Sequence, residues 1–214
     1  MNKTLKRALS GAVYVAIMWF GTSYSEFTFR LLFAILGIVS IYEMWKLRKE
    51  KTKILPFTYV IIPFFLIQLF EMTDVNYPNS PFNPSLILFM FILTWTFDTF
   101  AYLVGVKFGK HKILPYVSPR KSWEGFFGGF TFTIIASCIT YTYFDFESFK
   151  LPLIISIILP FTATLGDFIE SHYKREAGVK DSGNFIPGHG GILDRMDAFM
   201  ITIPILYILI NLYK

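Results

Sequence analysis

Three aspartates in the C-terminal part of the chain have the residue type and spacing of a divalent-metal site. Asp167 follows an apolar run, and Asp194 and Asp197 precede the next one. Asp194 and Asp197 are three residues apart, which places them on one face of a helix. Carboxylate oxygens suit a hard ion such as Mg²⁺, which bridges to phosphate oxygens. These acids indicate a Mg²⁺ site or, alternatively, interfacial acids that are paired with neighbouring bases.

Basic side chains surround these acids in the sequence and could bind phosphate. They are Lys121, Lys174, Arg175, Lys180 and Arg195. Lysine and arginine form charge-assisted hydrogen bonds, and arginine can bind a phosphate through two N–H groups. The segment Gly188-His189-Gly190-Gly191 resembles a backbone nest, where residues without Cβ let N–H groups approach a phosphate. The cluster as a whole favours a phosphorylated substrate.

Apolar helices must position these residues. Hydrophobic residues make up 54% of the chain and charged residues only 16%, which is too little charge for a soluble domain. The apolar runs, most of them near the length that crosses a bilayer as a helix, are 8–25, 28–47, 55–70, 85–105, 126–144, 151–169 and 198–212. We predict an all-α, polytopic transmembrane bundle of about seven helices. It forms one integral-membrane domain, 1–214, with N-terminal helices in 1–84 and catalytic helices and cytosolic loops in 85–214.

The distribution of Lys and Arg predicts the topology. With the N-terminus inside, only Arg30, Lys150 and Lys214 fall on the outer side, as the positive-inside rule requires. The polar loops 106–122 and 170–197 are then cytosolic, and the three aspartates lie at one membrane depth. We therefore expect a multi-pass protein of the inner (cytoplasmic) membrane. Glu43, inside the second apolar run, is either functional or reaches out to the cytoplasmic interface.

The segment 166–197 resembles the signature of phosphatidate cytidylyltransferases, also called CDP-diacylglycerol synthases. The matching residues are Gly166-Asp167-Phe168-Ile169-Glu170-Ser171, Lys174-Arg175, Lys180-Asp181, His189-Gly190-Gly191 and Asp194-Arg195-Met196-Asp197. The motifs Asp98-Thr99-x-Ala101-Tyr102-x-x-Gly105 and Ser118-Pro119-Arg120-Lys121-Ser122-Trp123-Glu124-Gly125 also resemble the family. Arg120 and Ser122 stand where the family commonly has Lys and Thr, and both keep the chemistry.

The resemblance implies transfer of CMP from CTP to phosphatidic acid, with Mg²⁺ as cofactor and membrane lipids around the protein. It leaves room for a second cation and for a homodimer, and no nucleic acid is expected. The catalytic residues that it implies are Asp167, Asp194, Asp197, Lys180 and Asp181, of which the first three hold metal. The substrate-binding residues that it implies are Ser118, Lys121, Lys174, Arg175, His189, Gly190, Gly191 and Arg195.

Two other functions remain open from the sequence. The first is another CTP-dependent lipid enzyme, either a polyprenol kinase or an archaeal-lipid cytidylyltransferase, which shares parts of the signature. The second is an ion-coupled transporter that uses Asp98 and Asp167 as carriers within the membrane.

Overall fold

The computed structural model describes residues 3–49, 51–70, 82–144, 146 and 148–213. Its helices are α1 Lys3–Ser23, α2 Glu26–Leu47, α3 Ile54–Leu69, α4 Ser85–Phe108, α5 Trp123–Thr140, α6 Lys150–Glu176 and α7 Leu193–Tyr213, with a 3-10 turn at Tyr141–Tyr143. The described ranges contain no strand, only the single antiparallel bridges Lys112–Ser122 and Ile186–Gly190. The predicted all-α fold is confirmed.

Each predicted apolar run forms a helix, but several helices extend into polar sequence. The run 126–144 begins earlier, at Trp123, because Ser122 caps α5 by accepting the Gly125 N–H at 3.2 Å. Helix α7 begins at Leu193, and α6 continues to Glu176 over 27 residues. At 1.5 Å per residue, α6 is about 40 Å long. Asp167 therefore lies inside α6, whereas the sequence had predicted it at the end of that helix.

Four of the described helices are long and apolar enough to cross a membrane. They are Glu26–Leu47, Ser85–Phe108, Trp123–Tyr143 (α5 with the 3-10 turn) and Lys150–Glu176. Shorter apolar helices occur at Ala8–Ser23 and Ile54–Leu69. The third apolar run thus forms a helix that is shorter than the other candidate spans, and the composition is that of a membrane protein.

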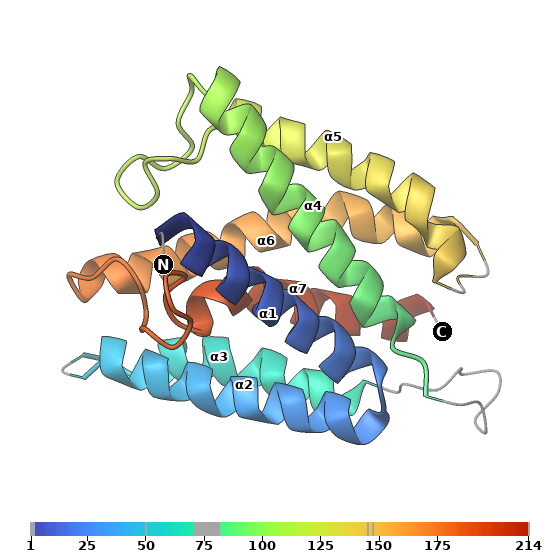
Figure 1. Cartoon of the computed structure of the whole chain (residues 1–214), viewed down its shortest axis with the longest axis horizontal. Helices are drawn as coiled ribbons and strands as arrows, with labels where there is room; N and C mark the ends of the chain where they lie inside the picture. The colour runs from blue at the N-terminus through green and yellow to red at the C-terminus, as the bar shows by residue number, and fades with distance from the viewer. Residues whose placement is uncertain (1–2, 50, 71–81, 145, 147, 214) are drawn as a thin grey trace.

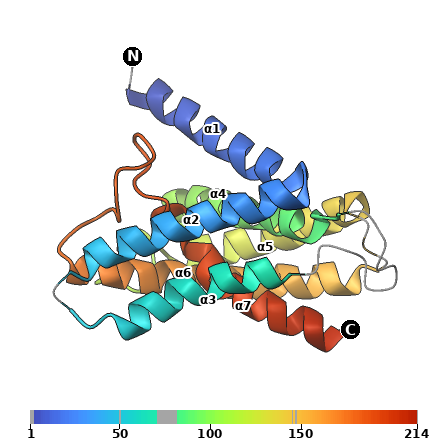
Figure 2. The same cartoon turned by 90° about the horizontal axis from the view of Figure 1, so that it is seen from below.

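Helix α7 lies between α6 and α3 in Figure 1, and Figure 2 shows that it starts inside the bundle while its C-terminal half emerges at one edge. It packs closely against α6 and α3, while α4 packs most extensively against α5. The ring of Phe199 on α7 stacks on Phe33 of α2, with centroids 5.4 Å apart, and contacts Phe64 of α3 at 5.8 Å. Any shift of α7 would therefore disturb the aromatic core.

The polar connections gather at one end of the bundle. The α4–α5 loop, the α6–α7 loop and the start of α1 all lie at the left of Figure 1, whereas the turn between α1 and α2 lies at the opposite end. This agrees with the charge pattern, which predicts both loops and the N-terminus on one side of a membrane.

Gly166 allows α6 and α7 to approach each other closely. A Cβ atom at Gly166 would collide with the carbonyl oxygen of Asp197 and lie 3.4 Å from the Cα of Ala198. The carbonyl oxygen of Gly166 also accepts a hydrogen bond from Tyr59 Oη at 2.8 Å. The backbone beside two of the predicted site aspartates is thus held by a residue without a side chain.

We predict that Gly166→Ala lowers thermal stability in detergent, because overpacking costs about 1–3 kcal/mol. Alanine is the better helix former by about 1 kcal/mol, so an increase in stability would show that α6 and α7 are not in contact here. Leu165→Ala is the control, since Leu165 is exposed on the same helix, and its melting temperature should change little. Thermal unfolding of the two purified variants measures the difference.

Candidate active site

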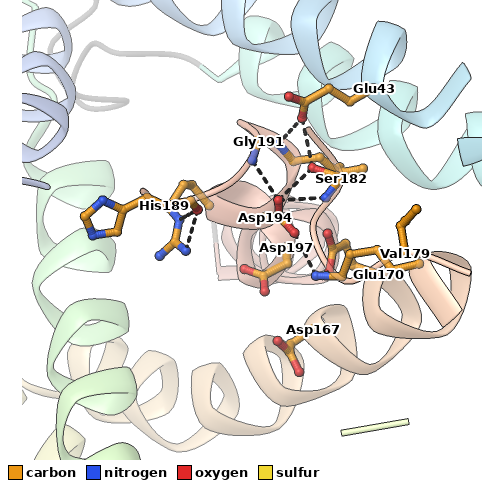
Figure 3. A network of polar contacts seen from close by, with 12 residues as sticks. Glu43, Asp167, Glu170, Val179, Ser182, His189, Gly191, Asp194 and Asp197 are labelled. Carbon is orange, nitrogen blue, oxygen red and sulfur yellow. Dashed lines mark hydrogen bonds and ion pairs between the residues drawn. The ribbon is translucent and has the colours of Figure 1, made fainter. Parts of the chain in front are cut away.

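The loop between α6 and α7, residues 177–192, folds around the carboxylate of Asp194 (Figure 3). Its Oδ2 accepts hydrogen bonds from the N–H groups of Ser182 at 2.8 Å and Gly191 at 2.7 Å. Gly190 adopts a φ of 86°, and a Cβ there would lie 2.6 Å from the same oxygen. The loop can therefore wrap this carboxylate only because position 190 lacks a side chain.

Lys174 connects Asp194 to a second buried acid. Its Nζ lies 2.7 Å from Asp194 Oδ1 and also pairs with Glu170, one turn earlier on α6. The Glu170 side chain is completely buried. Removing one partner of a buried ion pair typically costs about 3–5 kcal/mol. For Asp194, the pairing of an acid with a neighbouring base, which the sequence left open, is thus present.

Asp167 pairs with a base from a distant part of the chain. Lys121 Nζ, in the α4–α5 loop, lies 2.8 Å from Asp167 Oδ2 on α6. The two side chains are 31% and 23% exposed, so they are accessible from outside the bundle. This ion pair brings the Ser-Pro-Arg-Lys-Ser loop and the acidic helix α6 together.

Two more carboxylates lie near Lys121. Asp197 on α7 is within electrostatic reach of Asp167, Asp98 and Lys121. Figure 3 shows Asp167 and Asp197 on the facing helices α6 and α7. Asp197 accepts a hydrogen bond from the N–H of Ala198 at 2.7 Å. Three acids from three helices therefore share the neighbourhood of one lysine.

A pocket of about 720 Å³ opens beside this group, between α4, α5 and the loop that joins them. Its charged lining residues are Asp98, Lys112, Arg120 and Lys121, and its apolar wall includes Phe97, Tyr102, Val106 and Phe126. Glu124 fixes the loop by accepting hydrogen bonds from His111 Nδ1 at 2.6 Å and from the Lys110 N–H at 3.1 Å. The volume lies within the range of small-molecule sites, about 300–1,000 Å³.

The carboxylate oxygens of these acids are of the type that binds a divalent ion, but the positions of the acids do not by themselves form a metal site among the described residues. Among the described residues, no three His, Cys, Asp or Glu side chains are grouped so that they could hold a metal. Both oxygens of Asp194 already accept hydrogen bonds within the chain. Asp167 and Asp197 keep oxygen atoms of the type that Mg²⁺ prefers. The metal role of the three aspartates stays a prediction.

The other predicted site residues are spread over the same end of the bundle. Ser118 lines the pocket with Lys121. Lys180 and Asp181 are exposed on the α6–α7 loop. Arg175 is also exposed and donates a hydrogen bond to the Val179 carbonyl at 2.8 Å. The structure thus brings Ser118 and Lys121 together and leaves the other three on the outer surface of the site.

The His-Gly-Gly segment makes most of its contacts within the protein. His189 Nδ1 lies 2.9 Å from Ser10 Oγ on α1, and the His189 carbonyl accepts from Arg195 Nη2 at 2.9 Å. The His189 N–H donates to the Ile186 carbonyl, and the Gly191 N–H donates to Asp194. Two N–H groups of the predicted phosphate nest are therefore already used, and phosphate binding by this segment stays a prediction.

Sequence reasoning missed the structural roles of Ser182 and Tyr14 and left that of Glu43 undecided. Glu43 is only 4% exposed and accepts hydrogen bonds from the α6–α7 loop, so it does not reach out to the interface. Its position inside an apolar run was a signal of a buried partner. Tyr14 Oη lies 3.4 Å from the Arg195 carbonyl. Nothing in the sequence could have pointed to Ser182 or Tyr14, because their contacts join segments far apart in the chain.

Comparison with known proteins gives a family and several relatives. A model described as the cytidylyltransferase family matches residues 53–213, which is more than half of the chain. A phosphatidate cytidylyltransferase of Staphylococcus saprophyticus is 50% identical over 125 residues, covering 58% of this chain and 48% of the relative. Proteins of the same name from Staphylococcus epidermidis and Staphylococcus aureus are 47% and 46% identical over 125 residues, with the same two coverages.

The chain thus spans about half the length of the curated relatives it matches. The matched region holds every predicted site residue, from Ser118 to Asp197. The resemblance drawn from the signature is confirmed, and the chain belongs to the cytidylyltransferase family.

Proposed function

We propose that the chain transfers CMP from CTP to phosphatidic acid, giving CDP-diacylglycerol and pyrophosphate. The family and the name of the relatives support this reaction. The observation that carries it is the Lys121–Asp167 ion pair, which joins the pocket loop to the acidic helices. The same end of the bundle thereby offers bases for phosphate and acids for metal.

The pocket has the mixed chemistry that a lipid phosphate needs. Arg120 and Lys121 supply cationic donors, and arginine can bind a phosphate through two N–H groups. Phe97, Tyr102 and Val106 supply an apolar wall for the glycerol and the start of the acyl chains. The lipid phosphate would meet CTP at the polar end of the bundle, where the pocket opens beside the α4–α5 loop.

In the reaction, an oxygen of the lipid phosphate attacks the α-phosphorus of CTP. A new P–O bond forms, the bond between the α-phosphorus and the oxygen that bridges to the β-phosphorus breaks, and pyrophosphate leaves. The nucleophile is already an anion, so catalysis rests on positioning and on neutralising charge. Lys121 and Arg120 would hold the phosphates in line, and Lys121 would also keep Asp167 in place.

Asp167 and Asp197 are the residues that would hold Mg²⁺, and a bound Mg²⁺ would neutralise charge on the phosphates of CTP. Asp194 was predicted as a third ligand. Its four hydrogen-bond donors instead suggest that it fixes the loop and the first turn of α7. Asp194 would then act on the metal site through the position of Asp197.

The direct test incubates the purified chain with CTP, dioleoyl phosphatidic acid and Mg²⁺ and measures pyrophosphate and CDP-lipid. We expect the two products in equal amounts. A lipid kinase would release CDP instead of pyrophosphate. Transport of ions without turnover of CTP would indicate that the chain is an ion-coupled transporter instead.

We propose that the enzyme lies in the cell membrane with this site facing the cytosol, where CTP is found. Single cysteines at positions 110 and 180, in a chain whose exposed Cys138 is replaced by alanine, test this. Both positions are exposed and should react with an impermeant maleimide in inside-out vesicles but not in intact cells. Labelling of the two cysteines from opposite faces would exclude a single site built from both loops.

We predict that Lys121→Ala lowers kcat/KM for CTP by roughly 10- to 1000-fold, as expected when a charge-assisted contact is lost from a partly buried site. Lys110→Ala is the control, because Lys110 is exposed in the same loop and does not line the pocket. It should change kcat/KM less than about threefold, as expected of a solvated charge. Equal decreases of kcat/KM in the two variants would mean that the α4–α5 loop contributes only a general positive electrostatic potential. Steady-state kinetics at fixed lipid content give both values.

We predict that Asp197→Asn and Asp194→Asn abolish turnover for different reasons. Asp197→Asn should keep the melting temperature but lose the stabilisation that Mn²⁺ or Mg²⁺ gives the wild-type chain. Asp194→Asn should lower the melting temperature without any ion, because it breaks a buried pair with Lys174. Melting curves with and without the ions distinguish the two. Retention of more than about a tenth of the activity in Asp197→Asn would count against metal binding there.

A further inference from the structure

Glu43 of α2 contacts the start of α7 with its whole carboxylate. Oε2 accepts a hydrogen bond from the Leu193 N–H at 2.8 Å, and Oε1 accepts one from the Ile192 N–H at 3.2 Å. Ser182 Oγ lies 3.1 Å from Oε2. The side chain is buried, so three donors from one segment take the place of water.

These contacts cap the N-terminus of α7. The first N–H groups of a helix have no acceptor within the helix, and helix α7 begins at Leu193. A carboxylate at a helix N-terminus also interacts favourably with the helix dipole. Here the capping carboxylate comes from a residue that lies 150 positions before Leu193 in the chain. Helix α2 thereby fixes where α7 starts.

The contact reaches the candidate active site through one hydroxyl group. Ser182 Oγ lies between Glu43 Oε2 and Asp194 Oδ2, at 3.1 and 2.9 Å. A hydroxyl has one proton, so Ser182 donates to one of the two carboxylates at a time. A Cβ at Gly183 or at Gly191 would collide with the Glu43 carboxylate. The loop is therefore shaped around Glu43 as well as around Asp194.

The end of α2 holds the neighbouring helix too. Arg48, which follows α2 and is buried, pairs with Glu176 at the end of α6. Lys51 Nζ donates to the Glu176 carbonyl at 2.6 Å. Helices α6 and α7 are thus anchored to Glu43, Arg48 and Lys51, which precede the family match at 53–213.

We propose that Glu43 is a positioning residue for the cytidylyl transfer: it fixes the start of α7 and the α6–α7 loop, and so places Asp194 and Asp197. This rests on the proposed function. Oε2 of Glu43 faces the Leu193 N–H and Oε1 faces the Ile192 N–H, so a carboxamide would turn its own NH₂ group toward one of these N–H groups. Glu43→Gln should therefore break the contact with little change in volume.

The experiment compares Glu43→Gln with Glu26→Gln, the same substitution at an exposed position of the same helix. We expect kcat to fall on the order of 100-fold in Glu43→Gln, the effect of a displacement of about 1 Å at a reacting group, with KM for CTP changed less than about threefold. Hydrogen exchange should become at least about tenfold faster in peptides covering residues 182–193 and stay unchanged in α4 and α5. Glu26→Gln should match the wild type, and Glu43→Asp, which keeps the charge, should recover part of kcat.

Unchanged kcat in Glu43→Gln, or a fall in kcat without faster exchange in 182–193, would overturn the proposal. Faster exchange over the whole chain would also overturn it, because that result indicates general destabilisation. If Glu43→Gln does not insert, Glu43→Asp and Gly183→Ala, whose added Cβ would collide with the Glu43 carboxylate, decide by the same two measurements. If the wild-type chain makes no CDP-lipid, the proposed function fails while the exchange result still decides whether Glu43 fixes α7.

Discussion

Charges inside an apolar helical bundle must be compensated by the protein itself, and this constraint determines the polar end of the chain. A charged side chain at the centre of a membrane helix costs roughly 2.5–3.5 kcal/mol even on the mildest scale. Glu43, Glu170 and Asp194 lie in buried or nearly buried positions, and their partners are Lys174 and N–H or O–H groups of the α6–α7 loop. The loop has its shape because these carboxylates need donors.

The same constraint separates the charged residues into two groups. Those in the buried group, around Asp194, bind one another and hold the helices in place. The group around Lys121, with Asp98, Asp167 and Asp197, lies beside the pocket and has fewer hydrogen-bond donors from the chain. An accessible group of this kind is where phosphates and a divalent ion would add the missing compensation. Substrate binding would thus depend on the group around Lys121, and the packing of the helices would depend on the neighbouring group around Asp194.

The sequence predicted the helices well because each is a long apolar run, and it predicted one shared polar end from the Lys and Arg distribution. It placed Lys121 near the acids without identifying Asp167 as its partner. The wrapping of the α6–α7 loop around Asp194 could not be predicted, because two of the donors to Asp194 are the backbone N–H groups of Ser182 and Gly191, which carry no sequence signal. For the same reason the glycine pair predicted to bind phosphate was not seen to fold around Asp194. A charge inside an apolar run was a signal at Glu43, but its partner Leu193 lies 150 residues away in the chain.

The central claim is that the α4–α5 loop and the acidic helices form one site through Lys121 and Asp167. A double-mutant cycle on the affinity for a non-hydrolysable CTP analogue tests it most directly, using Lys121→Met, Asp167→Asn and the double variant. The account predicts strong coupling: after either substitution, the second should change the dissociation constant at least about fivefold less than it does in the wild type, a coupling of about 1 kcal/mol. Two effects that simply multiply would show that the residues act independently, and the single site would then be contradicted.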